Sequence, residues 1–176
     1  MIDSREQIPT LLSENSIGCE LGVFLGEYSE ILLSSKKFNR LYLVDTFDGQ
    51  IGSGDKYGNN MRILGGEYLL ANAIHKFQNN NTVEIIKSDS IKFLKNCNSN
   101  FFDFIYIDTV HTYKHLMQEL QESRRVIKLN GFICGHDYNK NVFPEVVTAV
   151  NDFCQMYNYT FYTTTKDILE SFIITK

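Results

Sequence analysis

The stretch Glu20-Leu21-Gly22-Val23-Phe24-Leu25-Gly26 decides the expected fold of this chain. It closes a short apolar strand predicted over residues 16–21 and precedes a helix predicted over about residues 27–35. Glycine at such a turn lets a ligand approach the backbone, and the helix N-terminus offers N–H groups that have no partner within the helix. The glycines could equally make a tight turn and nothing more. Their spacing is not Gly-x-Gly-x-x-Gly, which disfavours a dinucleotide-dependent dehydrogenase.

Apolar strands and amphipathic helices alternate along the rest of the chain, which is the pattern of an α/β protein. Repeated strand–helix units predict a parallel, doubly wound sheet with right-handed crossovers. The last two strands are too close in sequence for a helical crossover, so we expect an antiparallel pair. The expected strands cover residues 40–46, 82–87, 102–108, 131–136, 159–164 and 170–175; the expected helices cover 3–14, 67–77, a short run from 91, 112–127 and 144–157; residues 129–131 are expected to form a turn.

One globular domain over residues 1–176 accounts for the length and for the composition, which is 43% hydrophobic and 22% charged. The formal net charge of −4 lacks the basic excess of a duplex-binding surface, so we expect no nucleic-acid partner. The first residues lack the pattern of a signal peptide, and no apolar run approaches the ~20 residues that span a bilayer. We therefore expect a cytoplasmic protein without a membrane partner, and the sequence is compatible with a homo-oligomer.

Residues 47–66 form the least regular segment, with glycine at six positions and no apolar periodicity. Loops of this length in a compact domain are usually functional or disordered. We interpret the segment as a lid over a ligand pocket, with a plain disordered insertion as the alternative.

Polar residues follow the second and third predicted strands. Asp45 ends the second strand, and an acid at that place in a doubly wound fold typically accepts hydrogen bonds from ribose hydroxyls. Asp45 could instead cap the loop that follows it. Ser88 and Asp89 follow the third strand, where they could reach an adenine base, cap the next helix, or do both.

Acids and histidines follow the next two strands, at Asp108, His111, His136 and Asp137. Because the two strands are expected to be neighbours, these side chains should meet at one edge of the sheet. Carboxylates and an imidazole could hold Mg²⁺ or a similar cation, and a histidine could act as a general base. The alternative without a catalytic role is that the two acids cap loops and the two histidines make structural hydrogen bonds. His75 and His115 fall within helices and are expected at the surface or in packing.

The segments Ile107-Asp108-Thr109-Val110-His111-Thr112-Tyr113 and Gly135-His136-Asp137-Tyr138 carry a resemblance to a known family. The chain resembles the class I S-adenosylmethionine-dependent methyltransferases over roughly residues 16 to 157, most closely a small stand-alone group with these motifs. The resemblance implies a Rossmann-like sheet of seven strands in the order 3-2-1-4-5-7-6, mostly parallel, with strand 7 antiparallel.

The resemblance also implies roles for individual residues. Glu20, Gly22 and Gly26 would belong to the turn that holds the methionine part of the cofactor, Asp45 would bind its ribose, and Ser88 and Asp89 would lie by the adenine. Asp108 would border the methyl-transfer site, with His111 or His136 as the base. Similar sugar O-methyltransferases hold a divalent cation with acids that map onto Asp108 and Asp137, and His136 stands where a further acid is common.

This chain departs from the family pattern in two places. Val23 and Leu25 stand between the glycines of the turn, and Leu129-Asn130-Gly131 replaces the usual Pro-Gly-Gly. The segment Asp108-Thr109-Val110-His111 also lacks the Asn/Asp-Pro-Pro-Tyr/Phe pattern typical of enzymes that methylate amino groups of nucleic acids.

We therefore predict an enzyme that transfers a methyl group from S-adenosylmethionine to a hydroxyl of a small-molecule acceptor, such as a sugar or a secondary metabolite. The site would use Asp108, His111 and His136, and Asp108, His136 and Asp137 form a candidate Mg²⁺ site. Two alternatives are a non-catalytic S-adenosylmethionine-binding module and a nicotinamide-dependent oxidoreductase.

Overall fold

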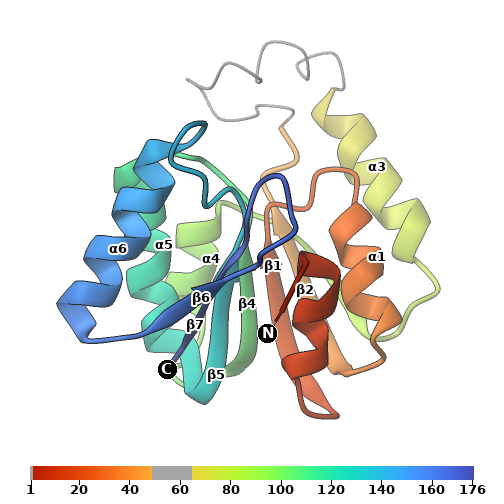
Figure 1. Ribbon diagram of the computed structural model, residues 1–176. Helices are drawn as coiled ribbons and strands as arrows, with labels where there is room; N and C mark the ends of the chain where they lie inside the picture. The colour runs from red at the N-terminus through yellow and green to blue at the C-terminus, as the bar shows by residue number, and fades with distance from the viewer. Residues whose placement is uncertain (1, 49–64) are drawn as a thin grey trace.

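Seven strands form one sheet in the computed structural model, which describes residues 2–48 and 65–176 (Figure 1). The strand order is β3-β2-β1-β4-β5-β7-β6, with β7 antiparallel to both β5 and β6 and the first five strands parallel. The predicted fold and strand order are therefore confirmed. The strands are β1 (Ser16–Leu21), β2 (Phe38–Asp45), β3 (Val83–Lys87), β4 (Phe102–Ile107), β5 (Ile127–Gly135), β6 (Phe161–Thr163) and β7 (Phe172–Thr175).

Helices cover both faces of the sheet, as Figure 1 shows. One face carries the 3₁₀ helix η1 (Arg5–Leu11), α1 (Glu27–Ser34) and α3 (Gly66–Phe77). The other carries α4 (Ser90–Asn96), α5 (Tyr113–Val126) and α6 (Pro144–Tyr157). No helix among the described residues is long and apolar enough to cross a membrane.

Strand β4 explains why the sequence shows a continuous apolar run rather than an alternating one. Phe104 and Tyr106 point into the core under η1, α1 and α3, while Ile105 and Ile107 point into the core under α4, α5 and α6. A parallel strand covered on both faces needs apolar residues at every position. The two cores fix β4 in the middle of the sheet, and its carboxyl end therefore lies at the centre of the site described below.

The expected helix over residues 3–14 is wrong in type and length. The structure has a seven-residue 3₁₀ helix, η1, which contains Pro9. Proline lacks a backbone N–H and clashes with the preceding turn of an α-helix, so a regular helix cannot run through this segment. Ile8 and Leu12 are nevertheless buried, so the apolar spacing identified the packed side of the segment.

The turn expected over residues 129–131 is also wrong, because these residues lie within β5. Asn130 has a φ of +63°, as the turn prediction requires. However, the segment forms an irregularity in the β4–β5 ladder, in which Ile127 pairs with Phe102 and Phe132 with Phe104. Asn130 N donates to Lys176 O, so the end of the chain binds this segment into the sheet.

The glycine-rich lid expected over residues 47–66 falls mainly on residues 49–64, which lie outside the described residues. Its last two residues are described: Gly65 is the N-cap of α3, and Gly66 is the first residue of that helix.

Candidate active site

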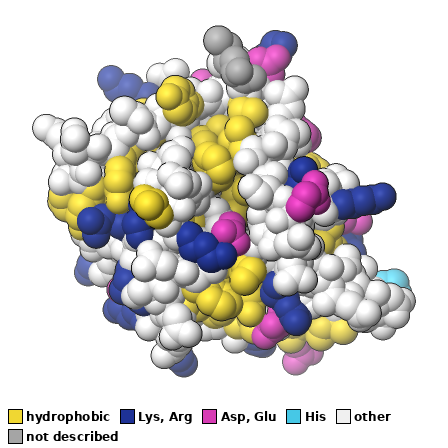
Figure 2. Space-filling model, turned by 90° about the horizontal axis from the view of Figure 1, so that it is seen from below, with side chains coloured by type: hydrophobic (Ala, Val, Ile, Leu, Met, Phe, Trp, Pro, Cys, Tyr) yellow, Lys and Arg dark blue, Asp and Glu magenta, His cyan; other side chains and the backbone are white. Residues whose placement is uncertain are grey.

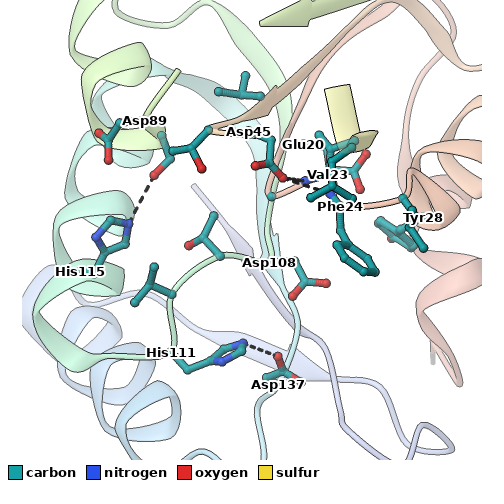
Figure 3. A pocket seen from close by; sticks show the side chains of 18 of the residues that line it. Glu20, Val23, Phe24, Tyr28, Asp45, Asp89, Asp108, His111, His115 and Asp137 are labelled. Atoms are coloured by element: carbon teal, nitrogen blue, oxygen red, sulfur yellow. Dashed lines mark hydrogen bonds and ion pairs between the residues drawn. The ribbon is translucent and has the colours of Figure 1, made fainter. Parts of the chain in front are cut away.

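A cavity of about 400 Å³ lies beyond the carboxyl ends of the parallel strands (Figure 3). This is where ligands bind in doubly wound sheets, and the volume lies within the usual range for small-molecule sites. Each of five successive strands contributes an acid to its wall: Glu20, Asp45, Asp89, Asp108 and Asp137. The five acids predicted from the ends of the strands are thus brought together.

Gly22 lines the cavity at a point where the neighbouring backbone leaves no room for a side chain. Its φ is +86°, and a Cβ atom at this position would lie 1.9 Å from the backbone oxygen of Asp108. The turn between β1 and α1 therefore passes directly against the end of β4. Gly26 has a φ of +73°, and a Cβ atom at that position would lie 2.9 Å from the ring of Phe77 on α3. Gly26 thus places α1 and is not among the residues lining the cavity.

Asp45 binds the backbone of two loops. Its Oδ2 atom accepts hydrogen bonds from the N–H groups of Val23 (2.8 Å) and Phe24 (3.0 Å), and its Oδ1 atom accepts one from Phe47 (2.8 Å). The capping alternative considered for this residue is therefore realised. A carboxylate has about four acceptor positions, so these three bonds with described residues leave one for a ligand.

Asp89, just after β3, also combines a hydrogen bond to the backbone with a position at the cavity. Its Oδ1 atom accepts a hydrogen bond from Lys92 N at 2.8 Å, which makes it the N-cap of α4. Ser88 and Asp89 both line the cavity as well. Capping and ligand contact are compatible here, because the cap uses one carboxylate oxygen.

Glu20 is buried in the wall of the cavity, with 2% of its surface exposed. Ser29 on α1 donates a hydrogen bond to its Oε2 atom at 2.5 Å. Burial raises the pKa of Glu20 to about 8, against the opposing effect of the Ser29 hydroxyl. At neutral pH the carboxyl group therefore carries a proton for much of the time.

Asp137 is the centre of the polar cluster at the ends of β4 and β5. Its Oδ2 atom lies 2.6 Å from His111 Nε2, and its Oδ1 atom lies 3.0 Å from His136 Nδ1. Figure 3 shows His111 and Asp137 pointing toward one another. Burial would raise the pKa of Asp137, but the hydrogen bonds from the two histidines outweigh this and hold it well below its usual range. Asp137 is therefore anionic, with an imidazole on either side.

Asp108 lies on the open side of this cluster. Its Oδ2 atom is 3.9 Å from His136 Nδ1, and its side chain is 30% exposed. Burial raises the pKa of Asp108, although the charge of His136 opposes the shift. His111 lines the cavity together with Asp108 and Asp137, whereas His136 lies behind Asp137 in a small second pocket.

Three of these residues could hold a metal ion. One ligand atom from each of Asp108, His111 and Asp137 lies within 4.8 Å of the other two. The sequence predicted a metal site of Asp108, His136 and Asp137, whereas the structure groups His111 with the two acids in place of His136. Two carboxylate oxygens and one imidazole form a donor set compatible with Mg²⁺ or Mn²⁺.

His115 was expected at the surface or in packing, but it lines the cavity beside Asp89 (Figure 3). Its Nε2 atom lies 3.3 Å from the fully buried Glu119, one turn further along α5. Glu119 also accepts hydrogen bonds from Ser90 Oγ (2.5 Å) and Thr109 Oγ1 (2.8 Å). The hydrogen bond with Glu119 raises the pKa of His115. The signal in the sequence was the spacing of four between a histidine and an acid on the helix after β4.

Comparison with known proteins gives one family. A family model described as a methyltransferase domain matches residues 19–138. No curated protein sequence matches the chain.

Solved structures share the fold at low sequence identity. A candidate rRNA methylase from Clostridium thermocellum superposes with a TM-score of 0.69 at 15% identity, covering 100% of this chain and 98% of that one. The O-methyltransferase NovP gives a TM-score of 0.68 at 15% identity, covering 97% and 75%. A candidate methyltransferase from Streptococcus mutans in complex with S-adenosylhomocysteine gives 0.67 at 13% identity, covering 96% and 93%. At these identities the similarity shows the fold alone.

Proposed function

The chain belongs to the methyltransferase-domain family and is an S-adenosylmethionine-dependent methyltransferase; we propose that it methylates a hydroxyl group of a small polar acceptor, such as a sugar or a secondary metabolite. Membership of this family also removes the support for a nicotinamide-dependent oxidoreductase. The observation that carries the proposal is the pairing of His111 with the buried Asp137 on the wall of the cavity.

The donor side of the cavity fits S-adenosylmethionine. The missing Cβ atom of Gly22 leaves room at the point where the backbone of β1 meets that of β4. Glu20 and Gly22 would hold the methionine part, Asp45 would accept a hydrogen bond from the ribose, and Ser88 and Asp89 would border the adenine. The bound donor supplies a methyl group on a positively charged sulfur, which is already activated for displacement.

The donor is already activated, but a hydroxyl acceptor must lose its proton when its oxygen takes the methyl group. His111 is suited to this task because its Nε2 atom lies 2.6 Å from Asp137 Oδ2, which orients the imidazole at the cavity wall, and Nδ1 would be the atom that takes the proton. The anionic Asp137 stabilises the imidazolium that results, and the ring of Phe143 packs on His111 at 4.2 Å between centroids. His136 Nδ1 lies 3.0 Å from the other oxygen of Asp137, which favours this orientation of the carboxylate.

A divalent cation offers a second way to activate the hydroxyl. Asp108, His111 and Asp137 would hold it, and when bound it would lower the pKa of the hydroxyl. A His111 nitrogen that ligates the metal cannot accept a proton, so in the cation mode that atom would not act as the base. Alignment of the two reactants in the cavity contributes in either mode and can be worth ~7–11 kcal/mol.

The test is methyl transfer from isotopically labelled S-adenosylmethionine to a panel of sugars, phenols and amines, with a separate arm of total RNA. We expect a product with the label on oxygen, identified by the ¹³C chemical shift of an O–CH₃ group. We expect His111→Ala to lower turnover about 10²–10⁴-fold, the usual contribution of a general base. His75→Ala, which removes an exposed histidine from α3, is the matched control.

Three results would contradict the proposal: label on nitrogen, label in RNA, or unchanged turnover in His111→Ala. If S-adenosylmethionine is not consumed with any acceptor in the panel, the result would favour the non-catalytic binding module. Parallel assays with EDTA and with added Mg²⁺ separate the two modes of activation, because only the cation mode depends on metal.

A further inference from the structure

Arg5 contributes a guanidinium group to the cavity from the N-terminal segment, and we propose that it binds the carboxylate of the donor's amino-acid tail. The sequence interpretation assigned no role to this residue. The inference rests on donor binding by the methyltransferase fold and is independent of the identity of the acceptor. Arg5 lines the cavity together with Glu20, Tyr28 and Asp108.

The backbone of Arg5 is fixed on both sides. Its N–H donates to Asp167 Oδ2 at 2.9 Å, and its carbonyl oxygen accepts a hydrogen bond from Tyr28 OH at 3.1 Å. Two residues earlier, the carbonyl oxygen of Asp3 accepts hydrogen bonds from the N–H groups of Thr165 and Lys166. The N-terminal segment is thereby attached to the loop between β6 and β7 and to α1. A side chain on such a segment is held at the cavity before a ligand arrives.

The guanidinium group itself lies between an aromatic ring and a carboxylate. Its carbon atom is 5.1 Å from the centroid of the Tyr28 ring, which is within the range of a cation–π interaction. Its NH1 atom is 3.8 Å from Asp108 Oδ2, which is longer than a hydrogen bond. One quarter of the side chain is exposed, so it can be reached by a ligand.

The charge distribution of the cavity explains why a cation is needed at this point. Among the described residues that line it, Arg5 is the single lysine or arginine, whereas acids come from five strand ends. The donor's tail carries both an ammonium and a carboxylate. The buried carboxyl group of Glu20 can accept a hydrogen bond from the ammonium through its carbonyl oxygen even when it is protonated, but the tail's carboxylate would meet Asp108 without a compensating charge. The planar guanidinium group matches a carboxylate in geometry and charge.

The experiment compares S-adenosylmethionine with decarboxylated S-adenosylmethionine, which keeps the sulfonium and the ammonium but lacks the carboxylate. Affinities of both ligands for the full chain are measured by titration calorimetry with the wild type, Arg5→Ala, Arg5→Gln and Arg5→Lys. Arg40→Ala is the matched control, because Arg40 forms a surface ion pair of similar length, 3.6 Å to Glu84.

We expect Arg5→Ala and Arg5→Gln to weaken S-adenosylmethionine about 10- to 100-fold, as for a lost charge-assisted hydrogen bond, and the decarboxylated ligand less than about threefold. Arg5→Lys should recover part of the difference, and Arg40→Ala should change neither affinity. Equal loss for both ligands would show that Arg5 acts through Asp108 or through folding, and no loss for either would show that it does not contact the donor; each result overturns the proposal. Because no acceptor is used, these outcomes do not depend on whether oxygen is the methylated atom.

Discussion

The two halves of the cavity use the same residue types in different ways. At the ends of β2 and β3, the carboxylates bind backbone N–H groups: Asp45 binds three and Asp89 binds one. On the side formed by β4 and β5, Asp137 binds two imidazole rings. The first side therefore holds loops in shape, and the second places titratable groups beside one another.

This difference suggests that the two sides of the cavity have different functions. A carboxylate that fixes backbone loops gives a rigid surface for a constant part of the ligand, which under the proposed function would be the donor. Side chains bonded to one another can exchange protons and accommodate acceptors of different shape. The following predictions test whether substitutions on the two sides have separate effects.

The largest effect is expected for Gly22→Ala on the donor side. The new Cβ atom would overlap the backbone oxygen of Asp108, and alanine is strained at a φ of +86°. We expect loss of measurable binding of S-adenosylhomocysteine in calorimetry, or loss of the folded state in thermal unfolding. Gly65→Ala is the control, because no atom of the described residues lies within 4 Å of the added atom. Wild-type affinity in Gly22→Ala would show that the turn does not shape the donor site.

A smaller effect is expected for Asp45→Ala, which removes the acceptor of three backbone N–H groups. We expect the free energy of unfolding to fall by about 2–4 kcal/mol, measured by urea denaturation, because buried donors lose their partner. Asp89→Ala, which removes one such bond, should cost ~1 kcal/mol, as for a helix N-cap. Equal costs for both substitutions would contradict the role of Asp45 as the residue that holds two loops.

Glu20→Gln should change how stability depends on pH. The raised pKa of Glu20, about 8, means that the folded state binds a proton that the unfolded state releases near pH 4.5. Stability of the wild type should therefore fall as pH rises between these values, by on the order of 1–3 kcal/mol, and Glu20→Gln should lose less. The measurement is urea denaturation at pH 5 and pH 8. Parallel curves for the two proteins would mean that Glu20 is ionised in the folded state.

The smallest effect is expected for His115→Gln. Because the pKa of His115 is raised by Glu119, its pairing stabilises the fold below the ordinary value of 6.5 and is lost as pH rises through the raised value. The wild type should exceed His115→Gln in stability by up to about 1 kcal/mol at pH 6, with the difference shrinking toward pH 8. His75→Gln, at an exposed position on α3, should show no such dependence. A constant difference would mean that His115 contributes by packing alone.

The sequence was sufficient to predict the features that depend on where the strands end. The order of the strands followed from the repeated strand–helix units and the resemblance, and it brought Asp108 and Asp137 together because neighbouring parallel strands end at one edge. From the net charge came only the expectation that no nucleic acid binds, which stays a prediction. On the face seen in Figure 2, Lys and Arg side chains are interspersed with Asp and Glu side chains.

The features that the sequence did not predict depend on contacts between distant segments. Arg5 reaches the cavity because η1 is bound to the loop after β6, and no local pattern around residue 5 indicates that contact. His115 faces the cavity because α5 begins directly beside Ser90 of α4. Asn130 has the predicted positive φ, but its hydrogen bond with Lys176, directly after β7, makes the segment an irregularity in a strand rather than a turn.

The most direct test of the account makes one chemical change on each side of the cavity, Asp45→Asn at the end of β2 and Asp137→Asn at the end of β5. Calorimetry gives the affinity for S-adenosylhomocysteine, and label transfer at saturating donor gives turnover. We expect Asp45→Asn to weaken affinity about tenfold or more with turnover nearly unchanged. We expect Asp137→Asn to lower turnover by at least about 100-fold with affinity within about threefold of the wild type. Loss of both properties in both variants, or the reverse assignment, would contradict the division between a donor side and a chemical side.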